Sequence, residues 1–378
     1  MVKQIFNRDF TLLFIGQFTF AFVLHTLTPT LPIYLSRLGS TEVEIGVIIG
    51  VFGASALVIR PFVGRALLKT PEKSFLIVGS LLFAFISIGF LLTSQFWPIL
   101  IVRIFQGFGF ACFSTAALLL VANISPEAQR GQSFSYFLLS PNTALALAPA
   151  FGMFIINNFN FSVLFWVCLG LSLCSLFIIN KLGKKEITIP EGSPIEGGVL
   201  FNRKALPPSL VGFFFQFILG PLNTFFPLYA IKHGVANPGF FFTTMAIMLI
   251  LGRALGGKIL DLYRLENVIL PCLITPIISM GILAFSKTLP MFILVAAIWG
   301  IGHAFIFPAL VAYTVDCVDS ARGPAVGTFT AITDFGMALG PVIMGSVVHL
   351  TNYKIMFLSL VLVGIINLSY FYFFVKKR

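Results

Sequence analysis

Runs of about 20 predominantly apolar residues recur along the whole chain of 378 residues. As a helix, each run is long enough to cross the ~30 Å hydrocarbon layer of a bilayer. Hydrophobic residues make up 58% of the sequence and charged residues only 10%, far below the roughly 25% of charged residues in soluble domains. The pattern predicts an integral membrane protein of the all-α class.

We predict twelve transmembrane helices. They are expected at residues 10–31, 44–66, 74–93, 97–121, 134–156, 162–180, 208–231, 239–262, 268–286, 290–314, 326–349 and 353–375. A membrane β-barrel is not expected, because its strands would alternate polar and apolar residues. The first apolar run is too long for the core of a signal peptide and lacks an A-x-A cleavage site, so we interpret it as an uncleaved helix.

The basic residues predict the orientation, because Lys and Arg in short loops stay on the cytoplasmic side. With the N-terminus inside, only Arg37, Lys232, Lys287 and Lys354 fall outside and Arg103 falls within a helix, which leaves 19 of the 24 basic residues on the cytoplasmic side. We therefore expect a multi-pass protein of the cell inner (cytoplasmic) membrane with both termini cytoplasmic. This bias also accounts for the net charge of +11 without a nucleic-acid partner.

The two halves of the chain resemble each other. LPIYLSRLG from Leu31 matches FPLYAIKHG from Phe226, and QGFGFA from Gln106 matches WGIGHA from Trp299, at offsets of 195 and 193 positions. The halves are separated by a segment rich in Gly, Pro and charge. We predict six-helix halves at 1–180 and 208–378, joined by a cytoplasmic linker at 181–207. Parallel repeats of this kind are typical of secondary transporters.

The chain resembles the major facilitator superfamily in two motifs. RIFQGFGFA, from Arg103, is similar to the Arg-x-x-Gln-Gly-x-Gly signature of the proton-coupled exporters, in the drug:proton antiporter-like and arabinose-efflux-permease-like branch. GMALGP, from Gly336, is similar to their Gly-x-x-x-Gly-Pro signature. The resemblance implies twelve helices in two pseudo-symmetric halves. It also implies that the first, fourth, seventh and tenth helices line a central cavity.

The same resemblance implies a cytoplasmic gate. The first copy of the gate motif, GRALLKTPEK, has Leu68 where the family has aspartate, whereas GKILDLYRLE in the second half keeps the acid. We therefore expect the stronger latch in the C-terminal half. The gate residues implied by the motif are Arg60, Gly64, Arg65, Arg253, Gly257 and Asp261.

Four ionisable residues within predicted helices are candidates for proton coupling, because a charge in the hydrocarbon core costs roughly 2.5–3.5 kcal/mol on insertion scales. They are Asp334, Arg103, His25 and His303. Asp334 leads, since desolvation favours a carboxyl that can take up a proton. The alternatives stay open: Asp334 could only bond a neighbouring helix, Arg103 could only lock helices together, and each histidine could be an ordinary hydrogen-bonded residue.

Other polar, aromatic and small residues suggest a substrate cavity and points of flexure. The cavity candidates are Gln106, Asn142, Phe105, Phe110, Asn223, Gln216 and Trp299. The flexure candidates are Gly107, Pro149, Gly336, Gly340 and Pro341, which could equally serve static packing. Most of the 45 phenylalanines are expected to face lipid or packed neighbours.

We predict a proton-coupled secondary active transporter that exports small amphipathic or aromatic organic molecules by alternating access. The alternative is an importer or facilitator of sugars, organic acids or metal chelates, because a fold does not determine a function. An enzyme is disfavoured, since no nucleotide-binding loop occurs and no nucleophile, base and acid fall together. We expect no cofactor and no metal, and a monomer whose partners are its substrate, protons and lipid.

Overall fold

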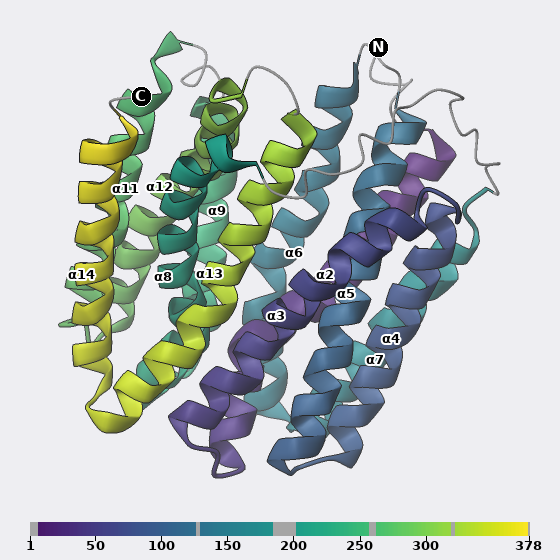
Figure 1. Cartoon of the computed structure of the whole chain (residues 1–378). Coiled ribbons are helices and arrows are strands. Elements are labelled where there is room, and N and C mark those ends of the chain that lie inside the picture. The colour runs from purple at the N-terminus through teal and green to yellow at the C-terminus, as the bar shows by residue number, and fades with distance from the viewer. Residues whose placement is uncertain (1–6, 126–128, 184–201, 257–261, 319–321, 377–378) are drawn as a thin grey trace. The chain divides into compact units, whose positions relative to one another are not determined.

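The computed structural model describes residues 7–125, 129–183, 202–256, 262–318 and 322–376, and these ranges are helical with short connections (Figure 1). The first six helices are α2 (Arg8–Arg37), α3 (Glu42–Ala66), α4 (Glu72–Leu92), α5 (Phe96–Ile124), α6 (Arg130–Asn158) and α7 (Phe161–Asn180). The next six are α8 (Leu206–Lys232), α9 (Gly239–Gly256), α11 (Leu265–Leu283), α12 (Leu289–Asp316), α13 (Arg322–Leu350) and α14 (Tyr353–Tyr370). A single 3-10 turn, Arg203–Ala205, precedes α8, and a π-helical turn, Phe371–Val375, follows α14.

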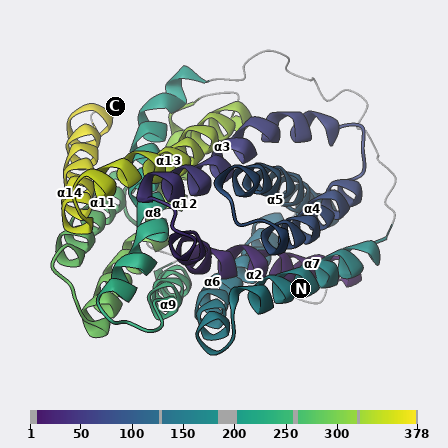
Figure 2. The same cartoon turned by 90° about the horizontal axis from the view of Figure 1, so that it is seen from below.

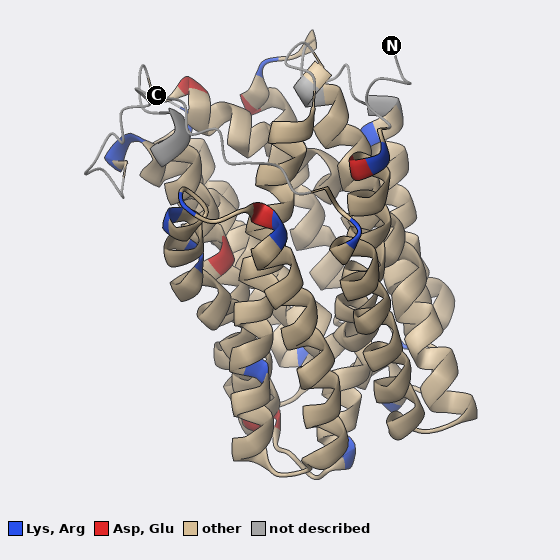
Figure 3. Ribbon diagram, turned by 90° about the vertical axis from the view of Figure 1, so that its right-hand side faces the viewer, with Lys and Arg blue, Asp and Glu red and all other residues tan. Residues whose placement is uncertain are grey.

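The predicted helices are confirmed. Within the described ranges, 11 helices are long and apolar enough to cross a membrane. The remaining one is α9, whose apolar part is shorter, and the end of the predicted helix 239–262 lies outside the described residues. In Figure 3 most of the ribbon is tan, and blue and red are concentrated towards the helix ends, as expected of a chain that keeps charge out of hydrocarbon.

The chain divides into two compact units. The first comprises Met1–Tyr34 and Val51–Ser193, and the second comprises Leu35–Gly50 and Pro194–Arg378. In the first unit α4 packs on α5 and α7, and α6 packs on the same two helices. In the second unit α8 packs on α13 and α14, while α12 packs on α9 and α11 (Figures 1 and 2). The sequence-based boundaries at 180 and 208 stay a prediction, and 184–201 of the proposed linker lies outside the described residues.

The repeat seen in the sequence recurs in local geometry at the ends of α2 and α8. Gly39 and Gly234, 195 positions apart, have positive φ angles of 86° and 78°. The residue after each glycine donates its amide N–H back to the carbonyl five positions earlier, at 3.1 Å for Ser40 to Leu35 and at 3.0 Å in the second copy. This is a Schellman C-cap, and glycine adopts its left-handed conformation without a Cβ clash.

A tyrosine near the end of each of these helices makes the same contact in both copies. The Tyr34 hydroxyl donates to the Thr93 carbonyl at 3.1 Å, and the Tyr229 hydroxyl donates to the Ser286 carbonyl at 2.7 Å. Each tyrosine also meets a phenylalanine edge-on, with ring centroids 5.1 Å apart in both units. Matched capping and matched tertiary contacts agree with the two pseudo-symmetric halves of the predicted fold.

In the second unit α13 packs tightly along α8, and glycines make this contact possible. A Cβ on Gly336 would collide with the Phe213 carbonyl, and one on Gly340 would collide with the Phe217 carbonyl. In the opposite direction, a Cβ on Gly220 would lie 2.5 Å from the Met337 carbonyl oxygen. The Gly-x-x-x-Gly-Pro motif therefore forms a groove into which the α8 backbone fits.

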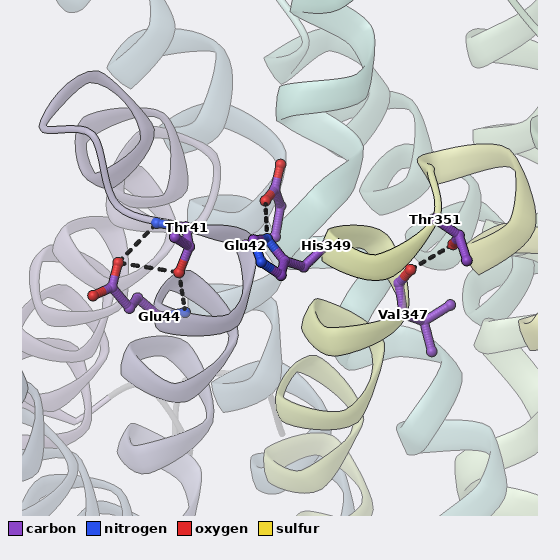
Figure 4. A network of polar contacts seen from close by, with 6 residues as sticks. All are labelled: Thr41, Glu42, Glu44, Val347, His349 and Thr351. Atoms are coloured by element: carbon purple, nitrogen blue, oxygen red, sulfur yellow. Dashed lines mark hydrogen bonds and ion pairs between the residues drawn. The ribbon is translucent and has the colours of Figure 1, made fainter.

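The other face of α13 packs against the first turns of α3, which belong to the same unit. A Cβ on Gly50 would lie 2.5 Å from the Ala338 carbonyl oxygen, and one on Gly345 would lie 2.5 Å from the Glu42 carbonyl oxygen. Figure 4 shows the end of this contact between α3 and α13, where His349 Nδ1 lies 3.4 Å from Glu42 Oε2. α13 thus makes close backbone contacts on two of its faces, with α8 and with the first turns of α3.

The groove yields a stability prediction. Gly340→Ala should lower the free energy of unfolding by roughly 1–3 kcal/mol, because the added methyl group meets backbone that cannot move away without separating the helices. The matched control is Gly327→Ala on the same helix, where a Cβ would meet nothing within 4 Å. The control should be neutral or stabilise by up to about 1 kcal/mol, since alanine is the better helix former. Thermal or denaturant unfolding in detergent measures both, and equal effects would contradict this packing.

Candidate functional site

Two helices of the second unit carry buried polar atoms without a hydrogen-bond partner among the described residues. On α8 these are Gln216 Oε1 and Asn223 Oδ1, and on α12 they are Trp299 Nε1 and His303 Nδ1. Residues seven apart, and residues four apart, share one face of a helix, so each pair forms a short polar stripe. Because α8 and α12 contact each other, the unit holds two stripes of unmet donors and acceptors.

Phe215 connects the stripes. Its ring centroid lies 5.3 Å from that of Trp299 and 5.6 Å from that of His303. Trp299 is fully buried, and its Nε1 can only donate, whereas the amide oxygen of Gln216 can only accept. An unmet buried polar group costs about 1–3 kcal/mol. A bound molecule with both a donor and an acceptor would remove that cost.

Asp334 lies half-buried on α13 at the level of the start of α8. Its neighbour Thr333 packs against Gly212, and the ring of Phe335 lies 6.1 Å from that of Phe213. Gln216 follows Phe213 by three residues, about one helical turn. The acid predicted to carry the proton is therefore presented by the helix that packs most closely on α8.

In the first unit, Arg103 is buried on α5 and is held by two neighbours. Its Nη1 donates to Gln106 Oε1 at 2.6 Å, and its guanidinium carbon lies 4.7 Å from the centroid of the Phe52 ring. The charge-assisted hydrogen bond and the cation–π contact both favour the charged guanidinium. Gln106 Nε2 is left buried without a partner among the described residues, so this side chain retains a donor.

A second cation belongs to the same cluster. The guanidinium carbon of Arg60 on α3 lies 5.6 Å from the Phe110 ring centroid, and the rings of Phe110 and Phe52 lie 5.4 Å apart. The contacts along α3 and α5 therefore run from Arg103 to Phe52, Phe110 and Arg60, with the two phenylalanine rings between the two arginines. Gly107 permits this contact, because a Cβ there would collide with Ser55 and with the Phe52 carbonyl.

The remaining cavity and proton candidates are not brought into these clusters by any contact among the described residues. His25 is half-buried on α2 and Asn142 is half-buried on α6. Phe105 is 47% exposed, and its ring packs at 6.0 Å on Phe108 of the same helix. Their roles stay predictions.

The gate candidates are described only in part. Gly64 and Arg65 are exposed at the end of α3. Arg253 on α9 is half-buried. Its Nε donates at 3.4 Å to the carbonyl of Ala304, the residue that follows His303 in the sequence. Gly257 and Asp261 lie outside the described residues. Pro149 and Pro341 are buried inside α6 and α13, where proline removes a helix hydrogen bond.

Sequence reasoning missed several residues that the structure brings to these sites. Phe52 and Phe215 gave no signal, because phenylalanine is abundant throughout the chain. Away from these clusters, Gln17 on α2 and Asn367 on α14 each keep a buried oxygen without a hydrogen-bond partner among the described residues, and an amide within an apolar run was a signal that could have been used. Asn367 also donates to the Val211 carbonyl at 3.1 Å, which ties α14 to α8.

No group of three metal-binding side chains is found in the part of the chain that the structure describes. The site chemistry is that of binding: unmet hydrogen-bonding groups, aromatic faces and isolated charges within apolar helices. A bundle of membrane-spanning helices with such sites defines a multi-pass membrane transport protein.

Sequence comparison agrees with this class. The chain matches the Major Facilitator Superfamily over residues 13–285 and 236–378, and it belongs to that family. It is therefore a transporter rather than an enzyme. It is 25% identical to the staphylopine export protein of Staphylococcus aureus (strain Mu50 / ATCC 700699) over 87% of this chain and 86% of that protein. It is 24% identical to the quinolone resistance protein NorA of Staphylococcus aureus (strain COL), over 97% and 96%.

Solved structures share the fold. A mutant of the nucleoside transporter NupG superposes with a TM-score of 0.84 at 15% identity, covering 97% of this chain and all of that one. The human organic anion transporter MFSD10 superposes with a TM-score of 0.73 at 14% identity, covering 96% and 98%. The predicted major facilitator fold is confirmed.

The unmet polar atoms yield a binding prediction. Gln216→Met keeps the length of the side chain and removes the amide, so the free energy of unfolding should stay the same or rise. If a substrate uses this amide, its Kd should rise about fivefold to tenfold, the equivalent of about 1–1.4 kcal/mol. Binding to purified protein and thermal unfolding measure the two effects. Gln132→Met, at an exposed amide on α6, is the control, and an equal change in Kd in both variants would contradict a role in binding.

Proposed function

We propose that the protein is a proton-coupled secondary active exporter of small amphipathic or aromatic organic molecules, working by alternating access. The observation that carries this proposal is the pair of stripes on α8 and α12, with their unmet polar atoms around the Phe215 ring. An apolar, aromatic surface with a few convergent polar groups is typical of small-molecule sites. The named activities of two relatives, staphylopine export and quinolone resistance, support outward transport.

Proton coupling rests on the position of Asp334. A carboxyl within a membrane helix is neutral when protonated and costly when charged, so protonation changes the energy of the helix that carries it. α13 packs closely on α8 through Gly336 and Gly340, and Gln216 on α8 is a candidate for binding the substrate. We infer that the charge of Asp334 and the occupancy of the α8 stripe act on the same helix pair.

Arg103 has a different role in this scheme. An arginine stays protonated in proteins, so it serves as a fixed charge and does not carry the proton. Its contacts with Gln106 and Phe52 hold the guanidinium in one place. We propose that it interacts with anionic groups of the substrate or of the proton pathway.

The location follows from the distribution of Lys and Arg and is likewise a proposal. We place the protein in the cytoplasmic membrane with both termini inside, since 19 of the 24 basic residues then face the cytoplasm. Reporter fusions at the C-terminus test the orientation directly.

The first functional prediction concerns Asp334. Purified protein is reconstituted with a pH indicator inside the vesicles, and quinolones, organic anions, amphipathic cations and sugars are added in turn. Wild type should show proton movement evoked by a substrate, and Asp334→Asn should abolish it while substrate exchange down a gradient persists. Asp9→Asn, at the start of α2, removes a carboxylate elsewhere and should leave coupling intact. Full proton coupling in Asp334→Asn would remove this acid from the mechanism.

A second prediction separates Asp334 from His303 as the proton carrier. His303→Gln keeps a hydrogen-bonding side chain but cannot titrate, whereas His303→Leu removes both properties. If Asp334 carries the proton, the Gln variant should retain substrate-evoked proton movement, and the Leu variant should bind substrate about fivefold to tenfold more weakly. Loss of proton movement in the Gln variant, with binding unchanged, would assign the proton to the histidine instead.

A further inference from the structure

The contact between the first turns of α3 and the end of α13 carries a titratable pair. His349 Nδ1 lies 3.4 Å from Glu42 Oε2, and Figure 4 shows the two side chains meeting between the helices. Among the described residues, the His349 side chain makes no other hydrogen bond or ion pair. The side chains of His349 and Glu42 are 49% and 35% exposed, so protons from the adjoining solution reach them.

The helix ends suit an ion pair at this position. Glu42 lies in the first turn of α3 and His349 lies in the last turn of α13. A negative charge is stabilising near the N-terminus of a helix, and a positive charge is stabilising near the C-terminus. A charged His349 therefore gains from Glu42 and from the dipole of its own helix, whereas a neutral imidazole 3.4 Å away makes only a long hydrogen bond.

Next to the pair, the backbones of the two helices are in contact. A Cβ on Gly345 would lie 2.5 Å from the Glu42 carbonyl oxygen, and one on Gly46 would collide with the Pro341 carbonyl. The second unit includes α3 only as far as Gly50, and the rest of this helix belongs to the first unit. The pair therefore lies at the end of a contact that holds part of a helix shared by both units.

The other charged groups at this end leave the histidine and its carboxylate as the responsive pair. Glu44 accepts from the Thr41 amide at 2.8 Å, and His233 Nδ1 lies 2.9 Å from the Tyr229 carbonyl of its own helix α8. The remaining groups are Tyr353 and Lys354 of α14, Lys232 of α8, Lys287 before α12 and Arg37 of α2. Tyrosine, lysine and arginine ordinarily keep their charge state between about pH 5 and pH 8, whereas histidine does not.

We propose that His349 is a proton-binding site separate from Asp334, and that its protonation tightens the contact of α3 with α13 through Glu42. In the proposed orientation this end of the unit faces the exterior, so the external solution supplies the proton. That assignment rests on the proposed function, in which external acidity then acts at both His349 and Asp334. The response of the pair itself to pH does not depend on what is transported.

The first test measures the separation of α3 from α13 in purified protein. Spin labels are attached at Leu38→Cys, before α3, and at Leu350→Cys, at the end of α13, which are 39% and 80% exposed. Cys174→Ser and Cys317→Ser remove the native thiols that are not buried. Asp334→Asn removes the other predicted proton carrier. Double electron–electron resonance then gives the ratio of near to far label pairs. This ratio should rise about twofold to fivefold from about pH 7.5 to about pH 5.5, as expected of a half-exposed ion pair.

The second test changes the histidine in the labelled protein. His349→Gln cannot be protonated, so the near-to-far ratio should stay low at both pH values. His349→Lys carries a permanent positive charge, so the ratio should be high at both. His233→Gln is the matched control, because it removes the other histidine at this end, and it should keep the rise.

Three results would overturn the proposal. A ratio that does not change with pH in the labelled protein would contradict any proton-dependent contact. An equal rise in His349→Gln would place the proton elsewhere. Loss of the rise in His233→Gln, with the rise kept in His349→Gln, would assign it to the other histidine. Because no transport is measured and Asp334 is already replaced, failure here leaves the proposed export function untouched.

Discussion

The exclusion of water from the hydrocarbon layer is the constraint on which the rest of this structure depends. Backbone groups must bond within the chain, so each apolar run forms a helix. Polar side chains in the same layer must find partners or remain costly. The unmet atoms of Gln216, Asn223, Trp299 and His303 are therefore the feature that most needs explanation. We propose that a small molecule that binds and leaves supplies partners for all four.

The same constraint explains the importance of glycine. Helices in lipid gain little from apolar burial against each other, so close backbone contact must hold them. Gly336 and Gly340 let α8 approach one face of α13. On the other face, Gly345 and the glycines of α3 let α3 approach α13. Asp334 lies on this tightly held helix. We propose that a change in its charge acts on a helix whose close contacts are made by backbone atoms.

Much of the fold could be predicted from sequence, because length and apolarity suffice for membrane helices and because two copies of one unit leave matching motifs. Even the cap at Gly39 and Gly234 lies in a matched pair of motifs. Candidate site residues could be named from the sequence where an ionisable side chain is rare in lipid, as at Arg103 and His303, and their roles stay predictions. It was not predictable where the partner is a common residue: Phe52 and Phe215 resemble the other phenylalanines until the helices are packed.

Uphill transport in purified vesicles tests the central claim most directly. Vesicles with an acidic lumen are given each substrate candidate at a low external concentration, and its internal concentration is followed with and without a protonophore. Proton-coupled antiport predicts accumulation above the external level, which protein-free vesicles do not show and which the protonophore abolishes. Equilibration without accumulation, or accumulation only when the exterior is the acidic side, would contradict the account.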